Sequence, residues 1–139
     1  MTVADLMREE VVTTDPDAPV DEVATAMRDE NVGSVVVVSD ETPVGLVTDR
    51  DVTVRIAADR LDAGEMTARD VMTEDPVTVD LDTGVFDLCN RLCDEGVRRM
   101  PVVDDGTLAG IVTLDDLTIL LTAELGNLAG VIESESPPY

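Results

Sequence analysis

Two pairs of residues place a hydroxyl and a carboxylate three positions apart, each directly after an apolar run. The pairs are Thr48 with Asp51 and Thr113 with Asp116. At a helix start such a pair forms a capping box, in which the hydroxyl accepts a hydrogen bond from a free backbone N–H and the acid reaches back. The same place suits a nucleoside phosphate, because free N–H groups attract phosphate and a carboxylate can accept two hydrogen bonds from a ribose. One threonine can serve both roles.

Three arginines near these pairs are candidates for phosphate contact. They are Arg50, Arg98 and Arg99, and the guanidinium group is well suited to phosphate oxygens. The alternative is a surface ion pair with surrounding carboxylates. Asp115, beside Asp116, disfavours a strongly anionic ligand at the second pair unless Mg²⁺ or Arg99 offsets its charge.

The elements that must position these residues occur twice. Residues 5–54 align without a gap onto residues 70–119, at an offset of 65, and 20 of the 50 aligned pairs are identical. Chance identity in this composition would be roughly five pairs, so an internal duplication explains the match.

Each copy predicts the order β-α-β-β-α. In the first copy, the apolar periodicity and turn residues predict strands at Val11–Thr14, Ser34–Ser39 and Pro43–Val47, a helix carrying Val20 to Met27, and a helix from about Thr48. The second copy predicts the same elements, with its last helix running from Thr113 through Leu121.

These elements predict an α/β (α+β) fold of two β-α-β-β-α repeats. One copy of this size buries too little apolar surface alone, so we expect the two sheets to pack together with the helices outside. The predicted segments are repeat 1 (1–58), a linker (59–69), repeat 2 (70–125) and a C-terminal tail (126–139), loose from Gly130 onward.

Composition excludes several functions. The chain has 31 acidic and nine basic residues, a net charge of −22, no His and two Cys. Nucleic-acid binding is disfavoured because it needs a basic face, and a transition-metal site is disfavoured because ligands are few. The acidity is typical of proteins in a high-salt cytoplasm, where screening reduces self-repulsion.

No apolar run has the length of a membrane span or a signal peptide, so we expect a cytoplasmic protein without membrane contact.

The motifs together resemble a known family. The pattern Gly-h-h-Thr-x-x-Asp-h (h, apolar) occurs twice, residues 99–104 read Arg-Met-Pro-Val-Val-Asp, and Asp-h-Met opens each copy. In order, spacing and duplication these motifs resemble a tandem pair of cystathionine-β-synthase (CBS) domains, also called a Bateman module. The resemblance covers nearly the whole chain.

The resemblance implies a pseudo-twofold pair with two clefts, and commonly a dimer of pairs. Members of the family often bind AMP, ADP or ATP, and some bind S-adenosylmethionine derivatives or dinucleotides. Carried onto this chain, the resemblance places Asp51 and Asp116 on ribose and Thr48 and Thr113 on phosphate. It also implies that backbone groups of four residues contact the edge of the base, namely Thr13, Thr14, Val77 and Thr78. The faces of the base would pack against the side chains of Val35, Met100 and Pro101.

The predicted function is therefore a regulatory module that senses an adenine nucleotide by a conformational change read by an effector protein, with no obligatory cofactor and no catalysis. An enzyme of the IMP dehydrogenase type, which carries such a module, is excluded because its catalytic barrel does not fit in this length. A second hypothesis is a homodimerisation module with vestigial clefts. Its interface would use apolar residues of the second helices, namely Val54, Ile56, Ile119, Leu120 and Leu121.

Overall fold

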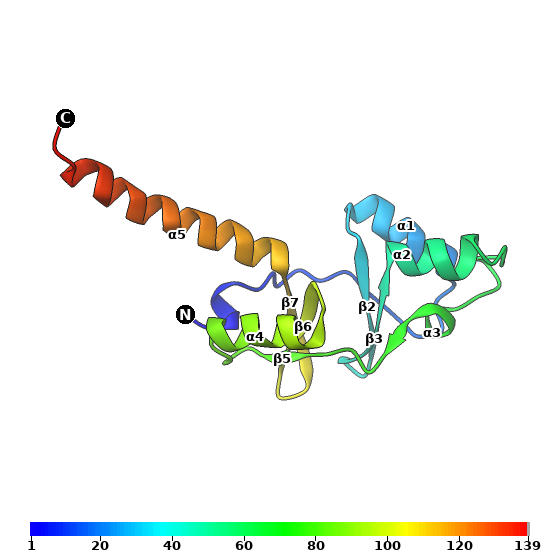
Figure 1. Ribbon diagram of the computed structural model, residues 1–139. Helices are drawn as coiled ribbons and strands as arrows, with labels where there is room; N and C mark the ends of the chain where they lie inside the picture. Colours follow the sequence, from blue (N-terminus) through cyan, green and yellow to red (C-terminus); the bar gives the residue numbers. More distant parts are fainter. Residues whose placement is uncertain (139) are drawn as a thin grey trace.

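The computed structural model describes residues 1–138, and its strands form two sheets (Figure 1). The strands are β1 (Thr13–Thr14), β2 (Ser34–Ser39), β3 (Thr42–Thr48), β4 (Thr73–Glu74), β5 (Val79–Asp80), β6 (Arg99–Asp104) and β7 (Thr107–Thr113). The strand order is β1-β2-β3-β4 in the first sheet and β5-β6-β7 in the second. The helices are α1 (Val20–Glu30), α2 (Asp49–Val52), α3 (Ala68–Val71), α4 (Val85–Glu95) and α5 (Leu114–Glu135), with a 3₁₀ turn η1 (Val3–Asp5) and a π-helical turn η2 (Thr53–Ala57).

The same antiparallel hairpin occurs in both repeats. In β2–β3 the pairing begins at Ser34 with Thr48, and in β6–β7 at Arg99 with Thr113. Both hairpins turn through two residues at positive φ, which is the geometry of a tight hairpin connection. The duplication therefore extends to strand register, and it places the two threonines at equivalent strand ends.

The repeats exchange their opening segments. Strand β4, from the second repeat, pairs with β3 of the first, and Arg8 bridges to Ile111 in β7. A Cβ at Gly45 would collide with the Met72 side chain as it lies in the structure, so the absence of a side chain at Gly45 permits this close approach. Gly110 is similarly crowded by Met7 and Arg8. Each sheet thus closes with chain from the other repeat, which ties the two halves together.

Two apolar cores lie between the sheets and their helices. In the first, Val35, Val37 and Val47 pack against α1, and in the second, Met100 and Val102 pack against α4. Alternate residues of a strand face opposite sides, so their neighbours point away from the cores. Val3 joins the second core and Ala68 the first, which repeats the exchange of opening segments in the packing.

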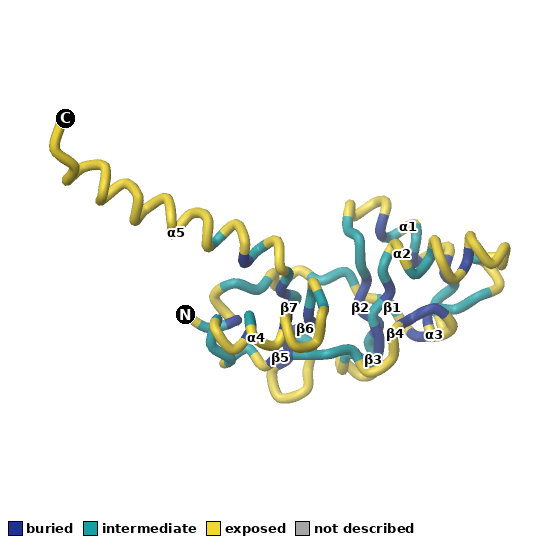
Figure 2. The backbone as a smooth tube through the Cα atoms, viewed as in Figure 1, coloured by how far each residue is buried: buried dark blue, intermediate teal, exposed yellow. Residues whose placement is uncertain are grey.

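Helix α5 is longer than the sequence pattern indicated. It continues to Glu135, so residues 126–135 of the predicted tail are helical, and Tyr139 lies outside the described residues. Gly126 and Gly130 weaken a helix without ending it, and the first proline after Leu114 is Pro137. After its first two turns the helix projects from the body and is exposed (Figures 1 and 2). By length and composition alone α5 could cross a membrane, although one such helix is weak support for that.

Candidate functional site

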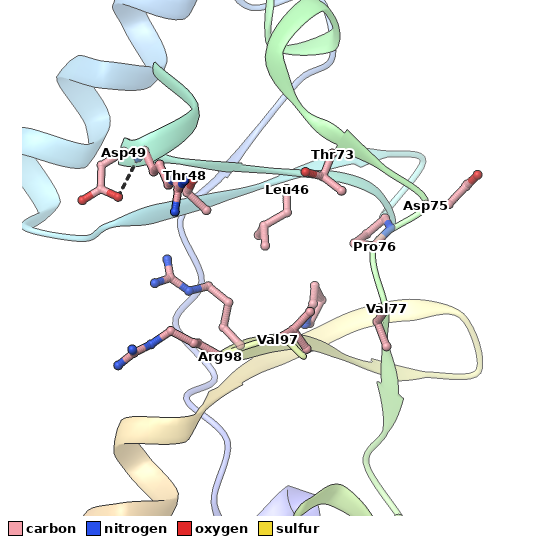
Figure 3. Close-up of a pocket in the computed structure, with 12 residues that line it drawn as sticks. Leu46, Thr48, Asp49, Thr73, Asp75, Pro76, Val77, Val97 and Arg98 are labelled. Carbon is pink, nitrogen blue, oxygen red and sulfur yellow. Dashed lines mark hydrogen bonds between the residues drawn. The ribbon is translucent and has the colours of Figure 1, made fainter. Parts of the chain in front are cut away.

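The first of two related hollows, cleft 1, lies between the end of β3 and the start of β6 (Figure 3). Its volume is about 350 Å³, within the usual range for small-ligand pockets. Its apolar wall consists of Leu46, Pro76, Val77, Val97 and Pro101, and its polar residues are Thr48, Asp49, Arg50, Thr73, Asp75, Arg98 and Arg99. An apolar wall facing several arginines can hold a flat apolar group beside an anion.

The second hollow, cleft 2, lies where the pseudo-symmetry requires it. It has a volume of about 270 Å³, and ten of its twelve lining positions lie 65 residues from a lining position of cleft 1. Its charged residues are Arg8, Glu10, Arg99 and Asp115. Arg99 lines both clefts, so the two sites meet at this side chain.

In cleft 1, Thr48 and Asp51 form the capping box predicted from the sequence. The Asp51 backbone N–H donates to the Thr48 hydroxyl at 3.1 Å, and the Thr48 N–H donates to the Asp51 carboxylate at 2.9 Å. The Asp51 side chain is 17% exposed and lies 3.8 Å from Arg55, whose guanidinium also donates to the backbone oxygens of Val71 and Met72. One Asp51 oxygen therefore lies beyond hydrogen-bonding distance from a cation that is already engaged elsewhere.

In cleft 2, a short ion pair engages the equivalent carboxylate. Arg8 donates to Asp116 Oδ1 through Nη2 at 2.6 Å and through Nε at 3.1 Å. The Thr113 hydroxyl donates to Asp116 Oδ2 at 2.7 Å. Partial burial favours the protonated acid, but the hydrogen bonds from Arg8 and Thr113 outweigh it and lower the pKa of Asp116 below its ordinary value. Both carboxylate oxygens are thus occupied within the protein.

Six of the predicted contact residues line cleft 1, and two line cleft 2. Those in cleft 1 are Thr48, Arg50, Val77, Arg98, Arg99 and Pro101, and those in cleft 2 are Arg99 and Thr113. Asp51 and Asp116 lie one helical turn behind the threonines.

The structure does not bring the other predicted residues into the clefts. Val35 and Met100 are fully buried in the two cores, because strand alternation points Arg99 and Pro101, and not Met100, toward cleft 1. Thr13, Thr14 and Thr78 lie just beyond the residues that line the clefts.

Sequence reasoning missed the chain segment before each first strand. Glu10, Val11 and Val12 line cleft 2, and Asp75 and Pro76 line cleft 1. The 65-residue offset already related these two segments, so it could have identified them as one element used twice. The sequence contained no comparable signal for Arg8 in cleft 2, because the residue 65 positions later is Thr73 and the two copies share no arginine there.

Arg98 lies 3.5 Å from Asp115, and both side chains are largely exposed, so this ion pair is weak and Arg98 can reorient. Among residues 1–138, no three His, Cys, Asp or Glu side chains gather in a group that could hold a metal ion.

Comparison with known proteins agrees with this architecture. The CBS domain family model matches residues 3–58 and 68–123. The chain is 36% identical over 119 residues to an uncharacterised protein, MK0525, of Methanopyrus kandleri, a match covering 84% of this chain and 61% of that protein. The chain therefore spans less than two thirds of this relative.

Solved structures show the same fold. The CBS domain protein NE2398 superposes with a TM-score of 0.79 at 28% identity, over 88% of this chain and 98% of that one. The CBS domain pair of MJ0100, in complex with 5′-methylthioadenosine and S-adenosyl-L-methionine, superposes with a TM-score of 0.79 at 23% identity, over 89% and 98% of the two chains. With both repeats matched by the family model, this chain belongs to the CBS domain family as a tandem pair.

Proposed function

We propose that the protein is a regulatory module that binds an adenine nucleotide in cleft 1. The observation that carries the proposal is the composition of this cleft, which joins an apolar wall to Arg50, Arg98 and Arg99. The base would lie against Val77 and Pro101, and the phosphates would lie toward the arginines and the Thr48 cap. The ribose hydroxyls would face Asp51, whose capping bond to Thr48 uses only one of its two oxygens.

The charge balance favours a phosphate over a cationic ligand. The charged residues lining cleft 1 are three arginines and two aspartates, which gives a formal charge of +1. The lining of cleft 2 carries two arginines and two acids, a formal charge of 0. An anionic nucleotide therefore gains more in cleft 1 than in cleft 2.

The solved CBS pair with 5′-methylthioadenosine and S-adenosyl-L-methionine supports the adenosine part of the ligand. Both of those compounds contain adenosine, and neither contains a phosphate. The arginines of cleft 1 are this chain's own argument for the phosphate, and they make AMP, ADP or Mg²⁺-bound ATP the preferred class over a sulfonium ligand.

The role that follows is signalling without catalysis. No His is available in the chain for a Ser-His-Asp or Cys-His set, and the carboxylates behind the two clefts are engaged, Asp51 in a helix cap and Asp116 in an ion pair. A ligand between two quasi-symmetric halves has different contacts in their open and closed arrangements, so binding shifts their relative orientation. A partner protein would read that shift.

Calorimetric titration in molar KCl tests the proposal. AMP, ADP, ATP with Mg²⁺, NAD, 5′-methylthioadenosine and S-adenosylmethionine are titrated into the wild type and into matched variants Asp51→Asn and Asp116→Asn. We expect one phosphate-bearing adenine compound to bind with one site per chain, and Asp51→Asn to weaken it about tenfold or more because a charged hydrogen-bond acceptor is lost. Asp116→Asn should leave it unchanged. Absence of binding by every compound would reject the proposal.

A further inference from the structure

Helix α2, which continues directly into η2, starts with three backbone N–H groups that already have acceptors within the protein. The Asp49 N–H donates to the Gly33 backbone oxygen at 3.0 Å, and the Asp51 N–H donates to the Thr48 hydroxyl at 3.1 Å. Between them, the Arg50 N–H donates to Oδ1 of the Asp49 carboxylate at 2.8 Å (Figure 3). An anion that approaches this turn therefore meets a carboxylate already in place.

Of these three acceptors, only the Asp49 carboxylate can leave without a rearrangement of the backbone. The Gly33 oxygen belongs to the chain that leads into β2, and the Thr48 hydroxyl can accept one hydrogen bond while it donates another. Asp49 is exposed, and rotation about its own side-chain bonds would free the Arg50 N–H. The contact between Asp49 and Arg50 is therefore the part of the helix start that a ligand can displace.

The Asp49 carboxylate also lies close to the arginines of cleft 1. Its Oδ2 is 3.5 Å from the position that a Cβ on Gly33 would take, and Arg99 Nη1 is 3.8 Å from the same position. Asp49 and Arg99 both line cleft 1. Backbone N–H groups at a helix start and guanidinium groups are the usual protein donors to a phosphate. The carboxylate thus lies beside donors of both kinds, where phosphate oxygens would bind.

The second repeat forms the same turn without such a carboxylate. The residue at the position of Asp49 is Leu114, whose N–H donates to the Arg98 backbone oxygen at 2.7 Å, and the Asp116 N–H donates to the Thr113 hydroxyl at 3.2 Å. The Leu114 side chain has no acceptor for the N–H that follows it. Since helix α5 starts with the same two contacts, the fold does not require an acid at this position. Asp49 is a feature of cleft 1 alone.

We propose that the Asp49 carboxylate is a built-in competitor of the phosphate in cleft 1 and turns away from the Arg50 N–H when a nucleotide binds. The inference rests on the proposed nucleotide site and adds the residue that limits its affinity. A phosphate has to break the contact between Asp49 and Arg50, and it is repelled by Asp49 until that side chain has moved. A ligand without a phosphate is not opposed in this way. Asp49 therefore sets the nucleotide concentration at which cleft 1 fills.

Three variants separate this competition from general charge and from helix stability. Asp49→Ala removes the carboxylate at the start of α2. Asp75→Asn removes the other negative charge that lines cleft 1, at a positive φ that asparagine tolerates. Asp21→Ala removes a similar contact at the start of α1, where the Glu22 N–H donates to Asp21 Oδ1 at 2.9 Å, and Asp21 lines neither cleft.

Calorimetric titration of AMP, ADP and 5′-methylthioadenosine in molar KCl measures the competition. We expect Asp49→Ala to bind AMP and ADP about tenfold more tightly than the wild type does, and 5′-methylthioadenosine within about twofold of the wild type. Salt at this concentration screens separated charges, so Asp75→Asn should stay within about twofold for all three compounds. Urea unfolding without ligand should show that Asp49→Ala and Asp21→Ala are both less stable than the wild type, because each loses an acid at a helix start.

A gain in nucleotide affinity together with a loss of stability is the signature of a competitor, since a purely structural residue would lower both. Unchanged or weaker binding of AMP and ADP by Asp49→Ala would overturn the inference and leave the proposed nucleotide site in place. An equal gain in Asp75→Asn, or an equal gain for 5′-methylthioadenosine, would also overturn it. Absence of binding by the wild type and by every variant would reject both the inference and the proposed function.

Discussion

Cleft 1 and cleft 2 share one backbone frame and differ in what fills it. Both have a threonine at a strand end that caps the following helix, at 3.1 Å in cleft 1 and 3.2 Å in cleft 2. The surrounding charges differ, since Arg98 and Arg99 occupy the positions of Gly33 and Ser34. Duplication has preserved the structural part of the site, whereas the part that would select a ligand has diverged.

The largest difference lies at the two carboxylates. Asp116 is held by Arg8 at 2.6 Å, whereas Asp51 has Arg55 at 3.8 Å. The position 65 residues after Arg8 is Thr73, which cannot form the equivalent ion pair. A single side chain from the exchanged opening segment therefore distinguishes a cleft with an available acid from one whose acid is engaged.

The strongest test of this difference is a matched pair of valine substitutions. Val77 lines cleft 1 and Val12 is its counterpart in cleft 2. Val77→Glu places a carboxylate on the wall where the base would lie and repels the phosphates, so we expect nucleotide affinity to fall about 100-fold or more. Val12→Glu should leave affinity within about twofold. Calorimetric titration measures both, and equal losses would show that the two clefts bind alike.

Removing Arg8 should make the clefts more similar. Arg8→Ala frees Asp116 Oδ1 but lowers the formal charge of the cleft 2 lining from 0 to −1, so the second, weaker site should suit an uncharged adenosine. We expect calorimetry to show one more bound 5′-methylthioadenosine per chain than in the wild type. Arg55→Ala is the control in the first repeat, and it should leave the stoichiometry at one. An unchanged stoichiometry in Arg8→Ala would mean that the acidic lining of cleft 2, and not the ion pair, excludes the ligand.

The capping threonines should affect stability equally and binding unequally. Thr48→Ala and Thr113→Ala each remove a helix cap, so each should lower the free energy of unfolding by about 1 kcal/mol. Only Thr48→Ala should also weaken nucleotide binding. Urea unfolding combined with titration separates the two effects. Weaker binding in both variants would contradict a single working cleft.

The sequence predicted the parts of this molecule that repeat. The 65-residue offset located both hairpins, both first helices and both caps, because duplicated chains fold by the same local rules. It also indicated that the clefts would differ at Arg50, Arg98 and Arg99.

The parts that could not be predicted depend on contacts between the repeats. The exchange of opening segments brings Arg8 to Asp116 across 108 positions, and no local pattern encodes that contact. Val35 and Met100 were expected beside the base because the resemblance identified the right strands. It did not show which side of the sheet each side chain points to. The second half of helix α5 was missed because its glycines and the nearby Pro-Pro indicated that the helix ends earlier than it does.

The ion pair of cleft 2 also predicts a small pH effect that cleft 1 should not share. The pKa of Asp116 is lowered in the folded protein, so its stabilisation is present above the unfolded value of about 3.9 and is lost as pH falls through the lowered value. Arg8 is 63% exposed, which limits the expected contribution to about 1 kcal/mol or less. Wild type and Asp116→Asn should therefore differ in unfolding free energy at neutral pH and converge as the pH falls below the lowered pKa of Asp116.

Urea unfolding of wild type, Asp116→Asn, Arg8→Ala and the double variant, in constant molar KCl, isolates this contribution. Hydrogen bonds from Thr67 lower the pKa of Asp70 as well. Asp70 and the other acids are common to all four proteins, so their contributions cancel in the cycle. The coupling free energy between Arg8 and Asp116 should stabilise the fold at neutral pH and vanish in acid. A coupling free energy that stays constant in acid would mean that Arg8 and Asp116 interact through packing and not through charge. Arg8 would then cover Asp116 at every pH.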